Sequence, residues 1–289
     1  MAKGRELKGR IKSVENTRKI TRTMEMVATS KMKRAVDRVT AARPYAEALT
    51  GVISSLYSEE LAARYPLLRQ PETIRRAAVI LITSNRGLAG AFNSNLIKEG
   101  RTLVEELEGR GIAVELHAVG RKGAGFFRYI NRDVKSVRLL EDRPSAESAT
   151  EVVDALMADF INGTIDAVYV VHAAFKSALS TPPARLQVLP VEPPQSEGGA
   201  AAQRDFLLFP SADAILQELL PSYVRNAVYR ALVETVAAEQ AARRTAMKNA
   251  TDNASEMLNI LRRTYNRARQ ANITQEIAEI VGGASALQG

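Results

Sequence analysis

Apolar and small side chains recur near the start of the chain at the spacing of one helical face. Ten positions have a mean spacing of about 3.6 residues, which places them on one side of an α-helix. They are Leu7, Ile11, Val14, Thr17, Thr21, Met24, Ala28, Met32, Ala35 and Val39. The stretch from Arg10 to Arg43 contains no glycine or proline, so it predicts a rod of roughly 51 Å. Pro44 either kinks this helix or starts the next one, and we expect an N-terminal shaft helix over residues 1–65.

The last part of the chain predicts a second, longer helix. From Tyr223 to Val281 there are 59 residues without glycine or proline, enough for a rod of roughly 88 Å. Small and partly polar side chains predict a seam that allows close helix contact, with buried asparagines fixing its register. The predicted seam is Val228, Leu232, Thr235, Ala238, Ala242, Thr245, Asn249, Asn253, Met257, Ile260, Thr264, Ala268 and Ala271. We expect the shaft helix over 223–285 to pair with 1–65 as an antiparallel coiled coil, with its tip extending beyond that helix or held by another partner.

Between the two helices the pattern changes to alternating short strands and helices. Five apolar runs predict strands at 77–83, 112–119, 134–139, 167–173 and 184–191. Helical patterns occur at 91–108, 123–130 and 145–161, with Ser145 as the cap of the last one. This alternation is typical of an open, Rossmann-like α/β body domain, expected over 70–195. The stretch 196–222 is interpreted as a mobile loop and lead-in, because Pro193–Arg204 has the composition of a loop.

Charge is distributed unevenly along the chain. The net charge of +8 divides into +9 for residues 1–43, −4 for 44–222 and +3 for 223–289. The helical rods are therefore basic and the body is not, which indicates an acidic partner around the rods. The sequence contains no apolar run long enough to span a membrane and no secretory signal pattern, so we expect a cytosolic origin.

Candidate chemistry is sparse. The chain has no cysteine, and its two histidines, His117 and His172, lie in apolar strand-like runs, so we interpret both as structural and expect no metal site. Thr83–Gly90 follows the first strand and contains Gly87 and Gly90. Such a turn can bind phosphate through backbone N–H groups, but the Gly-x-x-Gly spacing matches no nucleotide-binding motif, and a tight strand-to-helix turn is the simpler interpretation. We expect no catalytic residues and no cofactor.

The end of the C-terminal helix carries an apolar stripe. Ile273, Ile277 and Ile280 share one helical face, with Val281 beside them and Gly282-Gly283 directly after. A stripe at the far end of a rod has little of its own chain to cover it, so it indicates a partner or, alternatively, a frayed end.

Both ends of the chain closely resemble the gamma subunit of F-type ATP synthases. The N-terminal match runs from Ile11 to Thr21, through Met24–Ala28, to Ser30–Met32. The C-terminal match covers Tyr265–Gln270, Ile273–Ile277 and Glu279–Ala284, and Thr83–Gly90 resembles the strand-to-turn motif of the family. These motifs stand in the family's order and span nearly the whole chain.

The resemblance implies a rotor shaft that couples proton-driven rotation of a membrane ring to the catalytic cycle of the beta subunits, without catalysing a reaction itself. Its implied partners are a ring of three alpha and three beta subunits, the epsilon subunit and the membrane ring of c subunits, with one gamma chain per complex and no nucleic acid. It also implies a peripheral position on the cytoplasmic face of a bacterial inner membrane, and the lack of cysteine excludes the dithiol switch of chloroplast relatives.

The resemblance also implies roles for individual residues. A polar contact with beta maps onto Arg269, Gln270, Thr274 and Glu276, with Met24 opposite them in the N-terminal helix at a position that governs coupling. Ile273, Ile277, Ile280 and Val281 become an apolar bearing at the tip. Two alternatives remain open from the residues alone: a basic coiled coil that binds nucleic acid, and an α/β enzyme that uses the Gly87–Gly90 turn.

Overall fold

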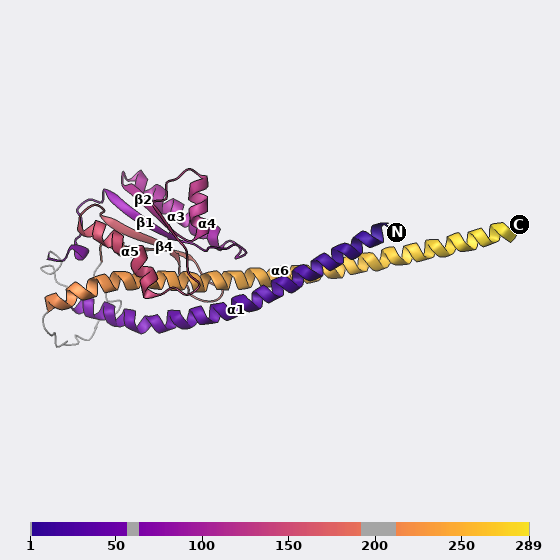
Figure 1. Ribbon diagram of the computed structural model, residues 1–289, viewed down its shortest axis with the longest axis horizontal. Coiled ribbons are helices and arrows are strands. Elements are labelled where there is room, and N and C mark those ends of the chain that lie inside the picture. Colours follow the sequence, from indigo (N-terminus) through magenta and orange to yellow (C-terminus); the bar gives the residue numbers. More distant parts are fainter. Residues whose placement is uncertain (1, 57–63, 192–211, 289) are drawn as a thin grey trace. The chain divides into compact units, whose positions relative to one another are not determined.

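The computed structural model describes residues 2–56, 64–191 and 212–288. Two long helices dominate the chain, α1 (Ala2–Leu56) and α6 (Ala212–Gln288), as Figure 1 shows. The chain divides into two compact units. Residues 1–28 and 243–289 form one, here called the helix-pair unit, and residues 29–242 form the other, here called the body unit.

The body unit contains a five-stranded sheet with the strand order β3-β2-β1-β4-β5. Its strands are β1 (Arg76–Ile82), β2 (Ala113–Val119), β3 (Ser136–Arg138), β4 (Ala167–Ala173) and β5 (Pro183–Leu189). Neighbouring strands are parallel except β4 and β5, which run antiparallel. Because β1 lies at the centre with β2 on one side and β4 on the other, the predicted open α/β sheet is confirmed.

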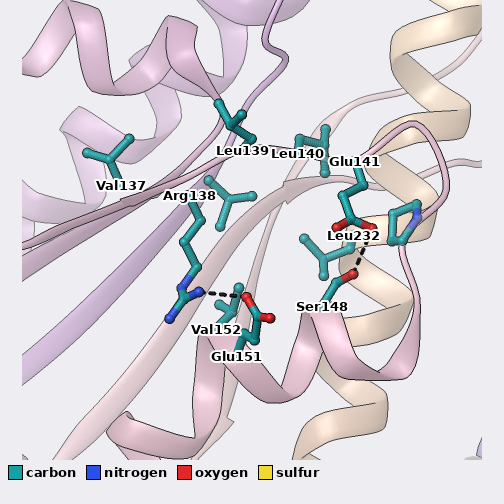
Figure 2. A pocket seen from close by; sticks show the side chains of 11 residues that line it. Val137, Arg138, Leu139, Leu140, Glu141, Ser148, Glu151, Val152 and Leu232 are labelled. Atoms are coloured by element: carbon teal, nitrogen blue, oxygen red, sulfur yellow. Dashed lines mark hydrogen bonds and ion pairs between the residues drawn. The ribbon is translucent and has the colours of Figure 1, made fainter.

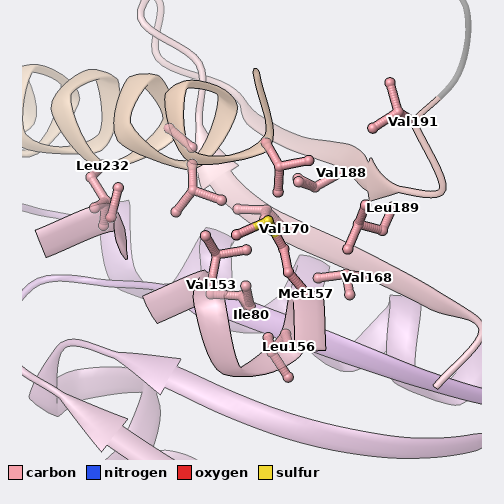
Figure 3. Packing of buried hydrophobic residues seen from close by; sticks show 14 of the residues in the cluster. Ile80, Val153, Leu156, Met157, Val168, Val170, Val188, Leu189, Val191 and Leu232 are labelled. Atoms are coloured by element: carbon pink, nitrogen blue, oxygen red, sulfur yellow. The ribbon is translucent and has the colours of Figure 1, made fainter. Parts of the chain in front are cut away.

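Helices cover both faces of this sheet. Alternate residues of β1 point to opposite faces, so that Ala78, Ile80 and Ile82 belong to one buried cluster and Ala77, Val79 and Leu81 to the other. The first cluster includes α5 (Ala146–Ile161), and the second includes α3 (Phe92–Gly109) and α4 (Arg121–Tyr129). Figure 3 shows Val153, Leu156 and Met157 of α5 packed beside Ile80 and β4. A short 3-10 helix, η1 (Pro66–Leu68), adds two buried leucines.

The cap predicted for α5 is confirmed. The Ser145 hydroxyl accepts a hydrogen bond from the backbone N–H of Ser148 at 3.3 Å, and the Ser148 hydroxyl accepts one from the N–H of Ser145 at 3.1 Å. This reciprocal pair satisfies two N–H groups that have no partner within the helix.

The body portions of α1 and α6 belong to the first cluster. Leu49 and Ile53 of α1 are buried in it together with a stripe on α6, at Leu216, Leu220, Val224 and Val228. The guanidinium of Arg225 on α6 donates two hydrogen bonds to the Asp154 carboxylate of α5, at 2.8 and 2.7 Å, which raises the pKa of Arg225. Packing and this paired contact together fix α6 on α5.

The start of the C-terminal helix differs from the sequence prediction. α1 continues through Pro44, and α6 begins at Ala212, not at Tyr223, and continues through Pro221. Residues 212–222 of the predicted loop are therefore helical, because burial of the stripe through Leu216 and Leu220 outweighs the backbone hydrogen bond that Pro221 removes. The rest of that loop, including Pro193–Arg204, lies outside the described residues.

Candidate functional site

The helix-pair unit carries the sequence-predicted contact residues on two antiparallel helices. The hydroxyls of Thr21 on α1 and Thr251 on α6 lie 2.8 Å apart and are buried. Each hydroxyl also lies near a backbone carbonyl of its own helix: Thr21 lies 3.1 Å from the carbonyl of Arg18, and Thr251 lies 2.9 Å from that of Met247. Glu15 forms an ion pair with Arg262 further along. Because the α1 number falls from 21 to 15 as the α6 number rises from 251 to 262, the helices run antiparallel, and this part of the predicted fold is confirmed.

The seam of this helix pair is shifted from the predicted one. On α6 the buried side chains are Met247, Thr251, Ala254 and Leu258, whereas Asn249 and Asn253 are exposed and Met257 is 53% exposed. The prediction of buried asparagines in the seam is therefore wrong. The observed seam is apolar at Met247, Ala254 and Leu258, and the Thr21–Thr251 contact and the Glu15–Arg262 ion pair hold its register.

The four polar residues predicted to contact a partner are all exposed on α6. They are Arg269, Gln270, Thr274 and Glu276. The Thr274 hydroxyl donates to the Gln270 carbonyl at 3.0 Å. In the part of the chain that the structure describes, Arg269 and Glu276 have no ion pair, so both charges remain available to another chain.

Met24 does not lie opposite these four residues. It is half-buried on α1, three residues from Thr21. Thr21 pairs with Thr251, which precedes Arg269 by 18 residues, or about 27 Å of helix. The expectation that Met24 faces the polar group is therefore wrong. In an antiparallel pair, residues after Thr21 on α1 lie opposite residues before Thr251 on α6, so Met24 lies still further from Arg269.

The apolar tip is exposed on α6. Ile273, Ile277, Ile280 and Val281 are 47%, 56%, 71% and 59% exposed. From the Glu15–Arg262 pair, each step toward the start of α1 matches one step toward the end of α6, because the two helices rise equally per residue. On this count Ala2, the first residue of α1, lies opposite about residue 275 of α6. Within this unit the C-terminal end of α6 therefore continues past the N-terminal end of α1, as Figure 1 shows. Nothing in the described chain covers this stripe.

Sequence reasoning missed a further set of exposed apolar residues on α1. Ile20, Met26 and Val27 are 59%, 59% and 51% exposed, outside the predicted seam of a helix that the sequence shows to be basic. Ile260 of α6, expected in the seam, is 57% exposed. A helical-wheel count of apolar residues off the seam would have found them.

The Thr83–Gly90 turn is fixed by its own hydrogen bonds. The Asn85 amide donates to the Leu140 carbonyl at 2.6 Å, and its oxygen accepts from the backbone N–H groups of Arg121 and Leu140 at 3.3 Å. The Asn93 amide oxygen accepts from the Ser84 backbone N–H at 3.0 Å. Since these polar groups hold the turn against neighbouring loops, the geometry favours a structural strand-to-helix connection over a phosphate cradle.

Both histidines lie within the sheet. His117 Nδ1 lies 2.8 Å from the Ser136 hydroxyl, and burial lowers the pKa of the ring. His172 lies 3.8 Å from the Glu234 carboxylate, and burial together with Arg230 lowers its pKa to about 4. No group of three potential metal ligands occurs among the described residues.

A pocket of about 420 Å³ lies between β3, α5 and α6 in the body unit. Figure 2 shows that its charged groups are engaged with one another. Arg138 donates to Glu151 at 2.7 Å, and the Ser148 hydroxyl donates to Glu141 at 3.0 Å. Val137, Leu139 and Val152 supply apolar lining. With its polar side chains paired, the pocket presents no acid, base or nucleophile poised for catalysis.

Long paired terminal helices, an α/β body and an apolar tip that is exposed in the described chain together define the class as a two-helix shaft protein with an α/β body. Comparison with known proteins agrees. The family model described as ATP synthase matches residues 3–287. The ATP synthase gamma chain of Gemmatimonas aurantiaca is 67% identical over 290 residues, covering all of both chains, and that of Leptospira biflexa is 43% identical over 288 residues, covering 99% of this chain and 100% of the relative.

Solved structures show the same fold. A chain of the Tetrahymena thermophila mitochondrial ATP synthase central stalk and c-ring structure is 25% identical with a TM-score of 0.62, covering 80% of this chain and 99% of the other. A chain of the Euglena gracilis mitochondrial ATP synthase has a TM-score of 0.69 at 21% identity, covering 99% and 95%.

The chain belongs to the family of ATP synthase gamma chains. As the resemblance implied, its family makes it a non-catalytic subunit. Among the described residues, no helix combines the length and the apolar character needed to cross a membrane.

Proposed function

We propose that this chain is the central rotor shaft of a bacterial F-type ATP synthase. Its membership of the gamma-chain family carries this proposal, and the likeness to a central-stalk chain of the Tetrahymena enzyme supports it. The partners are a ring of three alpha and three beta subunits, the epsilon subunit and the c-ring, with one copy of this chain per complex. The complex lies on the cytoplasmic face of the inner membrane, with proton flow turning the c-ring.

The shaft couples rotation of the c-ring to the catalytic cycle of the beta subunits, because it contacts each beta subunit differently at each rotary angle. A rotor that interacted equally with every beta conformation would shift none of them. The paired helices meet this requirement, because their surface is asymmetric around the axis. Arg269, Ile273, Glu276 and Ile280 follow one another at i, i+4 and i+3 spacings, so exposed charges of both signs and exposed isoleucines gather on one side of α6.

The tip residues act as an apolar bearing. The exposed stripe at Ile273, Ile277, Ile280 and Val281 can turn inside an apolar sleeve without exchanging directional bonds. The neighbouring polar group, Arg269, Gln270, Thr274 and Glu276, forms hydrogen bonds with beta that must break as the shaft turns. Apolar contact thus keeps the shaft centred and polar contact sets its preferred angles.

Deleting residues 269–289 tests this assignment. The chain is co-expressed with the alpha and beta subunits of one bacterial complex, and ATP hydrolysis of the purified assembly is measured. We expect the full chain to co-purify as a single copy and the deletion to lower turnover by up to about tenfold, a loss of about 1.4 kcal/mol. Removing residues 282–289 alone retains every proposed contact residue and should leave turnover near that of the full chain. Failure of the full chain to assemble would contradict the proposal.

Replacing Met24 with lysine tests angular coupling. A lysine there would pair with a beta carboxylate in one rotary state only and deepen one angular minimum. We expect ATP hydrolysis to persist while ATP-driven proton pumping in membrane vesicles falls several-fold. Met26→Lys places the same charge two residues away on another side of α1, where Met26 is 59% exposed. Normal pumping by Met24→Lys, or an equal loss in Met26→Lys, would contradict a specific role for Met24.

A further inference from the structure

A second cavity in the body unit has an unusual lining. It has a volume of about 130 Å³ and lies among α1, the loop between β3 and α5, and α6. Three cationic side chains of α1 line it, together with two loop residues and two residues of α6. They are Lys31, Arg34, Arg38, Asp142, Arg143, Val236 and Gln240.

The charges of this lining are not balanced. Four cationic side chains face one carboxylate, and Asp142 already accepts from the Lys31 ammonium at 2.6 Å. In the described part of the chain, Arg34, Arg38 and Arg143 have no hydrogen bond or ion pair. Like charges gathered at one cavity repel each other, so an anion between them would relieve that repulsion.

A neutral amide side chain lines the same cavity and adds a donor that does not depend on charge. Gln240 lies on α6 and is only 3% exposed. Its side chain makes no hydrogen bond among the residues that the structure describes. Because Gln240 lines the cavity, an oxyanion there could accept hydrogen bonds from its amide N–H groups.

We propose that this cavity binds a small tetrahedral oxyanion of the inorganic phosphate class. Arginine presents a planar fork of donors that matches phosphate oxygens, and the Gln240 amide adds a neutral donor from the other side of the cavity. The volume suits such an ion and is well below the roughly 300–1,000 Å³ typical of larger ligands. A bound oxyanion would join α1, the β3–α5 loop and α6 within the body unit. This site is independent of the rotor function proposed above.

Binding is tested on the purified full chain by thermal unfolding in phosphate, with chloride at equal ionic strength as reference. At ten times the dissociation constant, phosphate should raise Tm by about 2–4 °C. Arg34→Gln and Arg143→Gln should each weaken phosphate binding about tenfold or more, since each removes a charged donor. No rise in Tm for the parent chain would overturn the proposal.

Two further variants separate binding from general effects of charge or folding. Arg43→Gln removes an exposed arginine of the same helix that does not line the cavity, and should leave phosphate binding unchanged. Asp142→Asn removes the one acidic residue that lines this cavity in the described part of the chain, and should tighten binding several-fold, a gain that partial unfolding does not produce. Equal weakening by Arg43→Gln, or looser binding by Asp142→Asn, would overturn the site. A rise in Tm with a glutamate-rich peptide but not with phosphate would also overturn the proposal.

Discussion

Replacing Gly120 with alanine is expected to destabilise the body unit by about 3 kcal/mol or more, the range of a severe core substitution. Gly120 precedes α4 with a φ of +100°, a conformation that L-residues rarely adopt. A Cβ atom there would overlap the backbone carbonyl of Thr83 and lie 2.8 Å from its hydroxyl oxygen. Thr83 is fully buried and its N–H donates to Val119 at 2.7 Å, so the neighbouring strand cannot move aside without breaking the sheet. Hydrogen exchange of β1 and β2 amides, with thermal unfolding of the full chain, measures the loss.

Gly125→Ala is the matched control for this substitution. Gly125 lies in α4, the helix that Gly120 precedes, is exposed, and has no atom within 4 Å of an added Cβ. Alanine there should stabilise the helix by about 0.5–1 kcal/mol, because it restricts the unfolded chain without new contacts. If Gly120→Ala and Gly125→Ala showed the same Tm, the close approach of Gly120 to Thr83 would have no energetic consequence.

The sheet could be predicted because each strand carries a local signal. The apolar runs at 77–83 and 167–173 coincide with β1 and β4, and Ser145 marks the start of α5. The antiparallel direction of β5 was not predicted, although the short connection between β4 and β5 indicates it. Only nine residues separate Ala173 from Pro183, and a parallel crossover needs about a dozen or more.

The seam of α6 could not be predicted in the same way. Within the body unit α6 is covered on nearly all sides between Ala231 and Ala241, where even Glu239 and Gln240 are buried. A helix that is buried on all sides has no single apolar stripe. The helical face that is buried at Val228 therefore cannot be followed by sequence pattern through this segment. The prediction therefore placed Asn253 in the seam and left out Ala254, a shift of one residue.

The candidate site shows the same limit. The polar and apolar residues of the α6 tip were found from their spacing and from resemblance, and the structure places them exposed on one helix. The oxyanion cavity could not be found this way. Its residues come from three segments, at 31–38, 142–143 and 236–240, that only the fold brings together.

Lowering the pH from 7 to 4 is expected to destabilise the body unit through His172. Burial and Arg230 lower the pKa of this histidine from 6.5 to about 4 in the folded chain. The unfolded chain then binds more protons between these values, so stability is fully present above pH 6.5 and is lost as the pH falls toward 4. The shift corresponds to about 3 kcal/mol. Glu234 lies 3.8 Å from the ring but also accepts from the Phe175 N–H and lies 3.7 Å from Arg230, so its charge is shared.

His172→Gln isolates this contribution from the carboxylates that titrate over the same range. The variant stays neutral, so its stability relative to the parent chain should improve by about 3 kcal/mol between pH 7 and pH 4 in urea unfolding. His117→Gln provides the comparison. The pKa of His117 is also lowered by burial, but Glu115 and Asp159 oppose that shift, so its relative improvement should be smaller. If the parent chain and His172→Gln lost the same stability between pH 7 and pH 4, His172 would bind protons equally in the folded and the unfolded chain. The packing of β4 against α6 would then not depend on a neutral imidazole.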